Sequence, residues 1–274
     1  MLHHDHFTGS AATINDGVQR PTTAPVGGGR TTKKVDAEAM AKPSTAGAPI
    51  TRRRVDQDNL DQLAARLHSR SVSRYERLLK PLMDRVLAAA LVVVLGPVLL
   101  TVALAVLIVM GRPVLLGQTR MGRHNIPFAM LKFRTMLPDR RVADPADAYD
   151  GPDRRVIHKT PDDPRHTTLG RWMRKLSFDE LPQLFNVITG QMTLVGPRPE
   201  IIGMTANYTP WQRTRHLVKP GVTGLWQTTE RGKGLLLHEC IDLDLKYIER
   251  LSFREDMRIL LRTPAALLRN RGVV

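Results

Sequence analysis

Cysteine is nearly absent from this chain, since Cys240 is the only one in 274 residues. A single cysteine excludes an intramolecular disulfide framework and fits a reducing compartment. Aromatic residues make up only 5% of the chain, and no known nucleic-acid recognition motif occurs. The glycine-rich strings G-x-x-x-x-G-K-[S/T] and G-x-G-x-x-G are also missing, so the chain has no conventional P-loop or dinucleotide fingerprint.

Acidic residues are outnumbered by basic ones, 26 Asp and Glu against 41 Lys and Arg, which leaves a formal charge of +15. A charge of this size indicates an anionic partner: nucleic acid, an anionic membrane surface or a phosphorylated substrate. Residues 1–80 hold 13 basic and 8 acidic side chains, and residues 81–274 hold 28 and 18. The excess therefore follows the folded part of the chain and is not merely a basic tail.

The beginning of the chain lacks sustained apolar periodicity. Residues 1–58 are rich in Gly, Pro, Thr, Ala and charge, so we expect them to be disordered. No basic segment followed by an apolar run opens the chain, and we expect no secretory signal. Residues 59–85 predict a basic juxtamembrane helix lying on an anionic membrane surface; an ordinary solvated helix is the alternative. This prediction rests on the leucines near helical spacing: Leu60, Leu63, Leu67, Leu78 and Leu79.

One apolar run, Val86 to Met110, has 25 residues and no charge. That length is typical of a transmembrane helix, but Gly96-Pro97 lies near its middle, and proline kinks or breaks a helix. Each half is too short to cross a hydrocarbon layer of roughly 30 Å. Both flanks are basic, and positive flanks prefer the cytoplasmic side. We therefore expect residues 86–110 to form a re-entrant membrane helix; a kinked spanning helix is the alternative.

The remainder, residues 111–274, has the mixed composition of a soluble domain. Residues 114–116 and 128–131 are short apolar runs that predict strands. Residues 138–164 are polar and contain several prolines, which predicts a mobile insertion.

Helical spacing returns in the second half of this domain. Leu181, Leu184, Phe185 and Ile188 mark one apolar helix face that Gly190 ends. Residues 256–271 mix leucines with arginines, as an interfacial helix does. The sequence thus predicts a mostly helical α/β fold, in which a small cytosolic globular domain sits on a re-entrant membrane helix flanked by interfacial amphipathic helices.

Two adjacent carboxylates, Asp179 and Glu180, stand at a predicted helix start. Neighbours on a helix point about 100 degrees apart, so they cannot share one proton as a facing dyad would. One can attack or transfer a proton while the other holds a divalent cation, because Mg²⁺ takes carboxylate oxygens together with substrate phosphates. The alternative is a capping box, with Ser177 as N-cap and Glu180 three residues later.

Basic side chains lie near this pair in the sequence. Arg165 and Arg174 precede it, and the planar guanidinium suits phosphate. Arg198 stands between Pro197 and Pro199, which restrict the backbone on both sides. Such a rigid arginine favours anion recognition, with an exposed surface turn as the alternative.

Two further segments have a plainer alternative. Lys132 and Arg134 flank Phe133 in a predicted strand, which is either an anion contact or a basic edge strand. Residues 219–224, Lys-Pro-Gly-Val-Thr-Gly, are by themselves only a weak candidate for a phosphate loop.

These strings occur together, in this order, in one known family. From about Arg77 to Thr263 the chain resembles the bacterial sugar transferases, also called monotopic phosphoglycosyl transferases. Two departures stand out, since Gly96 replaces the serine usual before Pro97 and residues 225–231 lack the Asn-Gly often found there. The matching strings are residues 132–136 (KFRTM), 163–165 (DPR), 176–184 (LSFDELPQL), 195–200 (VGPRPE), 219–224 (KPGVTG) and 244–247 (DLKY).

The resemblance implies transfer of a sugar 1-phosphate from a UDP-sugar to undecaprenyl phosphate or a related polyprenyl phosphate, with release of UMP. This step would initiate assembly of an exopolysaccharide, capsule, O-antigen or glycoprotein glycan. It further implies that Asp179 is the nucleophile, forming a covalent aspartyl phosphosugar intermediate, and that Glu180 ligates Mg²⁺. The residues implied in substrate binding are Lys132, Arg165, Arg174, Pro197, Arg198, Pro199 and Asp244.

The expected location is the bacterial cytoplasmic (inner) membrane, in contact with its lipid and with the catalytic domain facing the cytoplasm. A membrane-anchored nucleic-acid-binding protein is the alternative from another class, because the charge allows it. Salt-sensitive DNA binding without UMP release would favour that alternative. The scarcity of aromatic residues and the missing recognition motifs lead us to expect no nucleic-acid partner.

Overall fold

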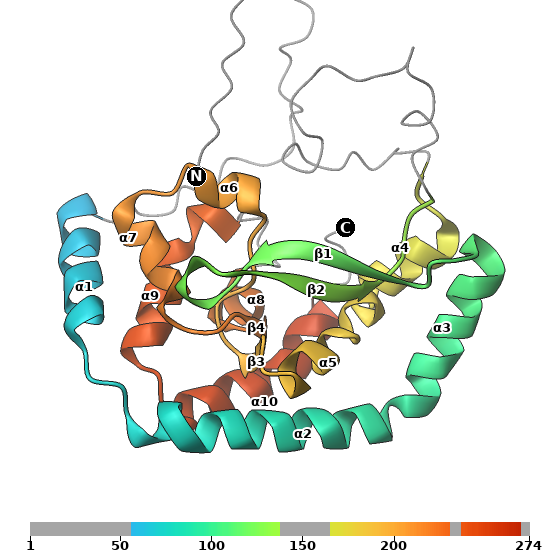
Figure 1. Cartoon of the computed structure of the whole chain (residues 1–274), viewed down its shortest axis with the longest axis horizontal. Helices are drawn as coiled ribbons and strands as arrows, with labels where there is room; N and C mark the ends of the chain where they lie inside the picture. Colours follow the sequence, from blue (N-terminus) through green and yellow to red (C-terminus); the bar gives the residue numbers. More distant parts are fainter. Residues whose placement is uncertain (1–55, 138–164, 231–236, 270–274) are drawn as a thin grey trace, which may run out of the picture. The chain divides into compact units, whose positions relative to one another are not determined.

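The computed structural model describes residues 56–137, 165–230 and 237–269, all within one compact unit (Figure 1). This part of the chain is mostly helical and carries two small sheets of two strands each. The prediction of a mostly helical α/β fold is confirmed. The predicted insertion at 138–164 and nearly all of the predicted disordered region at 1–58 lie outside the described residues.

The helices are α1 (Gln57–Ser69), α2 (Lys80–Val94), α3 (Gly96–Met110), α4 (Thr168–Lys175), α5 (Gln183–Ile188), α6 (Ile202–Ala206), α7 (Pro210–Arg213), α8 (Leu225–Thr229), α9 (Ile241–Glu249) and α10 (Phe253–Arg269). A π-helical turn, Tyr75–Leu79, leads into α2, and short 3-10 helices include Phe178–Glu180 and Thr214–Leu217. The strands are β1 (Leu115–Met121), β2 (Pro127–Phe133), β3 (Thr193–Val195) and β4 (Gly221–Thr223).

Helix α1 is shorter than the helix that the sequence predicted, and its apolar face is buried. The single basic helix predicted over 59–85 is wrong, because residues 70–73 are not helical. The apolar side chains of α1 are buried, and Leu63 and Leu67 belong to the same core cluster as Leu245 of α9. Since packing against the protein covers this apolar face, it is not available to a membrane surface.

The helix pair that follows is bent. The break expected at Gly96-Pro97 is present, because α2 ends at Val94 and α3 begins at Gly96. In the described ranges, no single helix is long and apolar enough to cross a membrane; Tyr75–Val94 and Gly96–Met110 satisfy that test only together, with a bend of 64°. Figure 1 shows α2 along the lower edge of the view and α3 turning away from it.

Apolar side chains remain exposed on both helices of this pair and on α10. On α2 and α3 they include Leu82 at 61%, Val93 at 78% and Leu100 at 73% exposure, and on α10 they include Leu261 at 81%. Exposed apolar surface of this extent marks a site of interaction with a membrane or a partner.

The strands predicted at 114–116 and 128–131 form a hairpin. Strand β1 pairs antiparallel with β2, with Leu116 opposite Lys132. Asn186 of α5 clamps this hairpin, because its side chain accepts a hydrogen bond from Leu131 N (2.9 Å) and donates one to Ala129 O (2.8 Å). The helix that follows the carboxylate pair is thereby tied to the strand that carries Lys132. Phe185 departs from the expected apolar face, since it is 39% exposed.

The second sheet holds the segment around Arg198. Strand β3 pairs parallel with β4, and Gly221 N donates to Pro197 O at 2.8 Å. A Cβ on Gly221 would lie 2.1 Å from Gly196 N, and one on Gly224 would lie 2.2 Å from Gly196 O. These glycines therefore permit close backbone packing beneath Arg198. That packing is a structural reason for the glycines of residues 219–224, separate from any phosphate loop.

Candidate active site

The carboxylate pair lies in a short 3-10 helix between α4 and α5. Asp179 and Glu180 are buried, with exposures of 7% and 9%. Ser177, just before this helix, has a left-handed backbone (φ 57°), and its side chain makes no capping hydrogen bond. The capping-box interpretation is therefore wrong. Glu180 does not reach back to cap the helix but binds cations.

Two of the predicted cations meet this pair. The Arg198 guanidinium binds Glu180 in a bidentate manner, at 2.6 Å from Nη2 to Oε1 and 3.3 Å from Nη1 to Oε2. The Nζ atom of Lys132 lies 3.3 Å from Glu180 Oε1 and 3.9 Å from Asp179 Oδ2. Strand β2 and the loop after β3 thus bring two positive charges to two adjacent carboxylates.

A third cation, Arg120 of β1, was not among the predicted residues. Burial and the positive charge of Arg198 together lower its pKa to about 10, against the opposing effects of Glu200 and Glu180. The pKa of Arg198 is raised, chiefly by the charge of Glu180. The cluster therefore concentrates positive charge in a largely desolvated place, which suits binding of an anionic substrate.

Arg198 is held from behind by a second arginine. Arg215 is 1% exposed, and its Nη2 donates to the main-chain oxygen of Arg198 at 2.6 Å. Its other contacts are Tyr208 Oη at 3.1 Å, Asp244 Oδ2 at 2.8 Å and Glu200 Oε2 at 3.5 Å. The structure thus connects Asp244 to Arg198 through Arg215.

Burial raises the pKa of Asp244 to about 6, although Arg215 acts to lower it. The sequence analysis did not single out Arg215, because Arg213 and Arg215 stand two residues apart in one basic stretch and nothing in the sequence separates them. Arg213 is exposed, whereas Arg215 is buried.

The other predicted site residues have the following places. Pro197 and Pro199 are buried on either side of Arg198. Arg174 is half-buried in the last turn of α4. Arg165 opens the second described segment, where its main-chain oxygen accepts a hydrogen bond from Leu137 N at 3.0 Å. The roles of these residues in substrate binding stay predictions.

The carboxylate pair could also contribute to binding a metal ion. No group of three or more His, Cys, Asp or Glu side chains gathers around one point in the part of the chain that the structure describes. Mg²⁺ does not require such a cage, because it commonly binds one or two carboxylates together with substrate phosphates. Glu180 supplies one such carboxylate beside Asp179, so the residues present fit a magnesium ion shared with a phosphorylated substrate.

An apolar groove of about 470 Å³ adjoins the segment that follows the pair. It is open along α3 and is lined by apolar residues. Pro182 and Phe185, which come shortly after Glu180, form one wall, and Phe133, next to Lys132, belongs to another. The groove therefore brings β2 and the segment after the carboxylate pair together with the exposed apolar surface of α3.

Comparisons with known proteins identify the family of the chain. The bacterial sugar transferase family matches residues 75–270. The chain is 37% identical to the uncharacterized sugar transferase EpsL of Bacillus subtilis, over 72% of this chain and 90% of that protein. It is 39% identical to a UDP-glucose:undecaprenyl-phosphate glucose-1-phosphate transferase of Caulobacter vibrioides, over 69% of each chain. A protein of the same description from Escherichia coli is 37% identical over 72% of this chain, but the match spans only 42% of that longer relative.

Proposed function

Because this chain belongs to the bacterial sugar transferase family, we propose that it transfers a sugar 1-phosphate from a UDP-sugar to a polyprenyl phosphate and releases UMP. The observation that carries this proposal is the buried Asp179–Glu180 pair beside Lys132 and Arg198. A reaction that brings two phosphorylated substrates together needs this positive surrounding, since it lowers the repulsion between them. The names of the relatives from Caulobacter vibrioides and Escherichia coli support the same reaction class.

Asp179 is the nucleophile in this proposal. Its carboxylate oxygen attacks the β-phosphorus of the UDP-sugar, a bond forms between that oxygen and phosphorus, and the bond to the bridging oxygen breaks so that UMP leaves. A phosphate oxygen of the polyprenyl phosphate then attacks the same phosphorus and frees the Asp179 carboxylate. Three distances support this division of roles. Arg198 Nη2 and Lys132 Nζ lie 2.6 and 3.3 Å from Glu180, whereas Lys132 Nζ lies 3.9 Å from Asp179. Glu180 is therefore the carboxylate that is paired more closely with cations.

The cations have the role of holding phosphate. When the substrate binds, Lys132 and Arg198 give up some of their contacts with Glu180 and bind the diphosphate instead. Arg165 and Arg174 add further positive charge for binding phosphate. Mg²⁺, held by Glu180 together with the diphosphate, would offset negative charge on the phosphoryl group.

The acceptor is undecaprenyl phosphate or a similar polyprenyl phosphate. The apolar groove along α3 supports this choice, because it is lined by apolar side chains and its lining includes Pro182, two residues after Glu180. A polyprenyl chain lying in this groove brings its phosphate toward the cations.

The bent helix pair is proposed to enter the cytoplasmic membrane and return, with the catalytic domain on the cytoplasmic side. The 64° bend and the exposed apolar side chains of α2 and α3 support this placement. Single cysteines at the exposed positions Gln62 and Ile126, in a chain lacking Cys240, test it by labelling of intact cells. A re-entrant pair leaves both positions on one side, and labelling from opposite sides would reject it.

The decisive experiment is UMP release by Asp179→Asn, measured with a panel of UDP-sugars and undecaprenyl phosphate. The variant should lose UMP release with every sugar that the wild type accepts, and the wild type alone should yield a trapped phosphosugar adduct on residue 179. Asp61→Asn, which changes an exposed carboxylate of α1, is the matched control. Wild-type activity in Asp179→Asn would overturn the assignment of the nucleophile.

A further inference from the structure

A second cavity, of about 440 Å³, has several charged side chains in its lining and does not include the carboxylate pair. It opens between the start of α2, the turn after α5 and the segment that carries Lys219. None of its lining residues is Asp179, Glu180, Lys132 or Arg198. Its charges are therefore available for a role apart from sugar-phosphate transfer.

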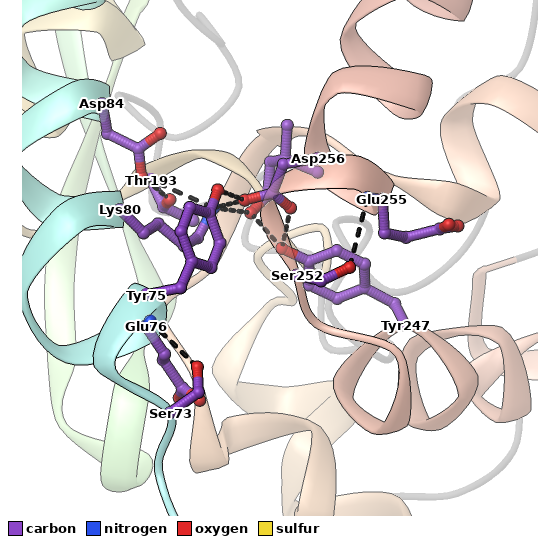
Figure 2. Close-up of polar contacts among 11 residues, drawn as sticks. Ser73, Tyr75, Glu76, Lys80, Asp84, Thr193, Tyr247, Ser252, Glu255 and Asp256 are labelled. Carbon is purple, nitrogen blue, oxygen red and sulfur yellow. Dashed lines mark hydrogen bonds and ion pairs between the residues drawn. The ribbon is translucent and has the colours of Figure 1, made fainter.

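The acidic side chains that line this cavity already have cations or donors. Both oxygens of Glu76 accept hydrogen bonds from Arg70 at 2.8 Å. Asp84 accepts a hydrogen bond from Thr193 and lies 3.6 Å from Lys80 Nζ. Figure 2 shows Asp84, Thr193 and Lys80 together at one side of this network.

Lys80 is neutralised in turn by Asp256. Their charged groups are 2.6 Å apart, and Asp256 also accepts hydrogen bonds from Tyr75 (2.5 Å) and Tyr247 (2.7 Å) (Figure 2). Asp84 and Asp256 together carry one more charge than Lys80, so this network leaves at most one negative charge to set against the four remaining cations of the cavity.

Four other cations line the same cavity: Arg77, Arg85, Arg123 and Lys219. Within residues 56–137, 165–230 and 237–269, none of them forms an ion pair. Arg123 directs its Nε to Leu217 O at 3.1 Å, which leaves its charge uncompensated.

Gly190 lets two of these cations come together. It has a left-handed backbone (φ 81°), and a Cβ on it would lie 2.6 Å from Arg85 Nη2 and 3.6 Å from Lys219 Nζ. Burial lowers the pKa of Lys219, and the charges of Arg85 and Arg123 lower it further, against the smaller opposing effect of Asp84. Like charges held this close favour an anion between them.

We propose that this cavity binds a phosphate group, held by Arg85, Arg123 and Lys219, at a site separate from the catalytic pair. The exposed leucines Leu79, just before α2, and Leu82, in its first turn, lie near the start of this helix, so the phosphate of a membrane lipid is within reach when this surface meets a bilayer. A free phosphate ion would meet the same cations. The site does not depend on the transfer reaction proposed above.

The test uses the full chain in a neutral detergent and follows thermal unfolding and binding while a probe is added. The probes are phosphatidylglycerol in mixed micelles, inorganic phosphate, and a diacylglycerol of the same chains as the lipid without phosphate. The double variant Arg85→Gln/Lys219→Gln should bind phosphatidylglycerol at least about tenfold more weakly than the wild type. Lys219→Arg, which keeps the charge, should retain binding.

Arg254→Gln/Arg262→Gln is the matched control, because it removes two exposed charges from α10 outside this cavity. Binding of phosphatidylglycerol alone identifies a lipid phosphate as the ligand, and binding of inorganic phosphate as well identifies the phosphate group itself. Equal weakening in the two double variants would show a general surface-charge effect and overturn the site. Failure of the wild type to bind either phosphate probe would overturn it too. If the double variant is not folded before any probe is added, the single variant Lys219→Gln replaces it and must still bind phosphatidylglycerol more weakly than the wild type.

Discussion

Arg215 donates a hydrogen bond of 2.6 Å to the main-chain oxygen of Arg198, whose guanidinium binds Glu180 on the opposite side. A buried arginine thereby positions the arginine that faces the carboxylate pair. Asp244 supports this arrangement by its ion pair of 2.8 Å with Arg215. The position of Arg198 thus depends on contacts between residues far apart in the chain.

The change Arg215→Lys separates positioning from stability. Lysine keeps the charge that pairs with Asp244, but a single ammonium cannot also reach Tyr208 and the Arg198 carbonyl. We expect kcat/KM for UMP release to fall by about tenfold or more, with a much smaller loss of stability than in Arg215→Gln. The glutamine variant leaves Asp244 buried without a cation, which costs about 3–5 kcal/mol. Steady-state kinetics and thermal unfolding measure the two effects, and full activity in Arg215→Lys would contradict the positioning role.

Glu180→Gln tests the proposed metal ligand. The amide keeps the shape of the side chain but loses the negative charge. That charge pairs with Arg198 and, in the proposal, holds Mg²⁺, so activity should require a higher Mg²⁺ concentration. The measurement is UMP release over a range of Mg²⁺ concentrations. Asp179→Asn should not recover at any of them. An unchanged Mg²⁺ dependence in Glu180→Gln would argue against this ligand.

Leu104→Gln tests the apolar groove as the acceptor site. Leu104 lines the groove on α3, and a polar side chain there should weaken binding of the polyprenyl chain. We expect the KM for polyprenyl phosphate to rise by about tenfold while the KM for the UDP-sugar stays the same. Ile108→Gln is the control, because Ile108 is 73% exposed on the same helix and does not line the groove. If both variants change the acceptor KM alike, the groove is not the acceptor site.

His216 makes the protein sensitive to acid. Burial, together with the positive charges of Arg215 and Arg213, lowers the pKa of this side chain to about 4. The unfolded chain, with an ordinary pKa near 6.5, binds the proton first, so the stability due to neutral His216 is present above pH 6.5 and is lost as pH falls toward 4. His216→Gln should remove this loss, on the order of 3 kcal/mol.

Thermal unfolding of wild type and His216→Gln between pH 7.5 and about 4 measures the difference. Asp244 acts in the opposite direction, since its pKa of about 6 makes the folded state gain stability as pH falls. Asp244 is present in both proteins, so their difference reports His216 alone. If the stability of the two proteins changes with pH in the same way, His216 is not the source of the acid sensitivity.

Several parts of the fold follow from local sequence. Strands near β1 and β2, the break before Pro97 and the helix end at Gly190 were predicted from short apolar runs and from proline and glycine, whereas the pairing of the two strands was not. Each depends on neighbouring residues alone. The end of α1 at Ser69 and the exposure of Phe185 were not predicted, because packing against distant elements decides which face of a helix is covered.

The same distinction holds for the site. By itself the sequence determined the adjacent carboxylates, the rigid arginine between two prolines and the excess of positive charge, since these are properties of residue type and spacing. Only the tertiary structure decided that Lys132 and Arg198 meet Glu180 and that Arg215 lies behind Arg198. It also decided that Lys219 shares a cavity with Arg85. Those contacts join residues at least 17 positions apart in the sequence, and the packing of the whole domain brings them together.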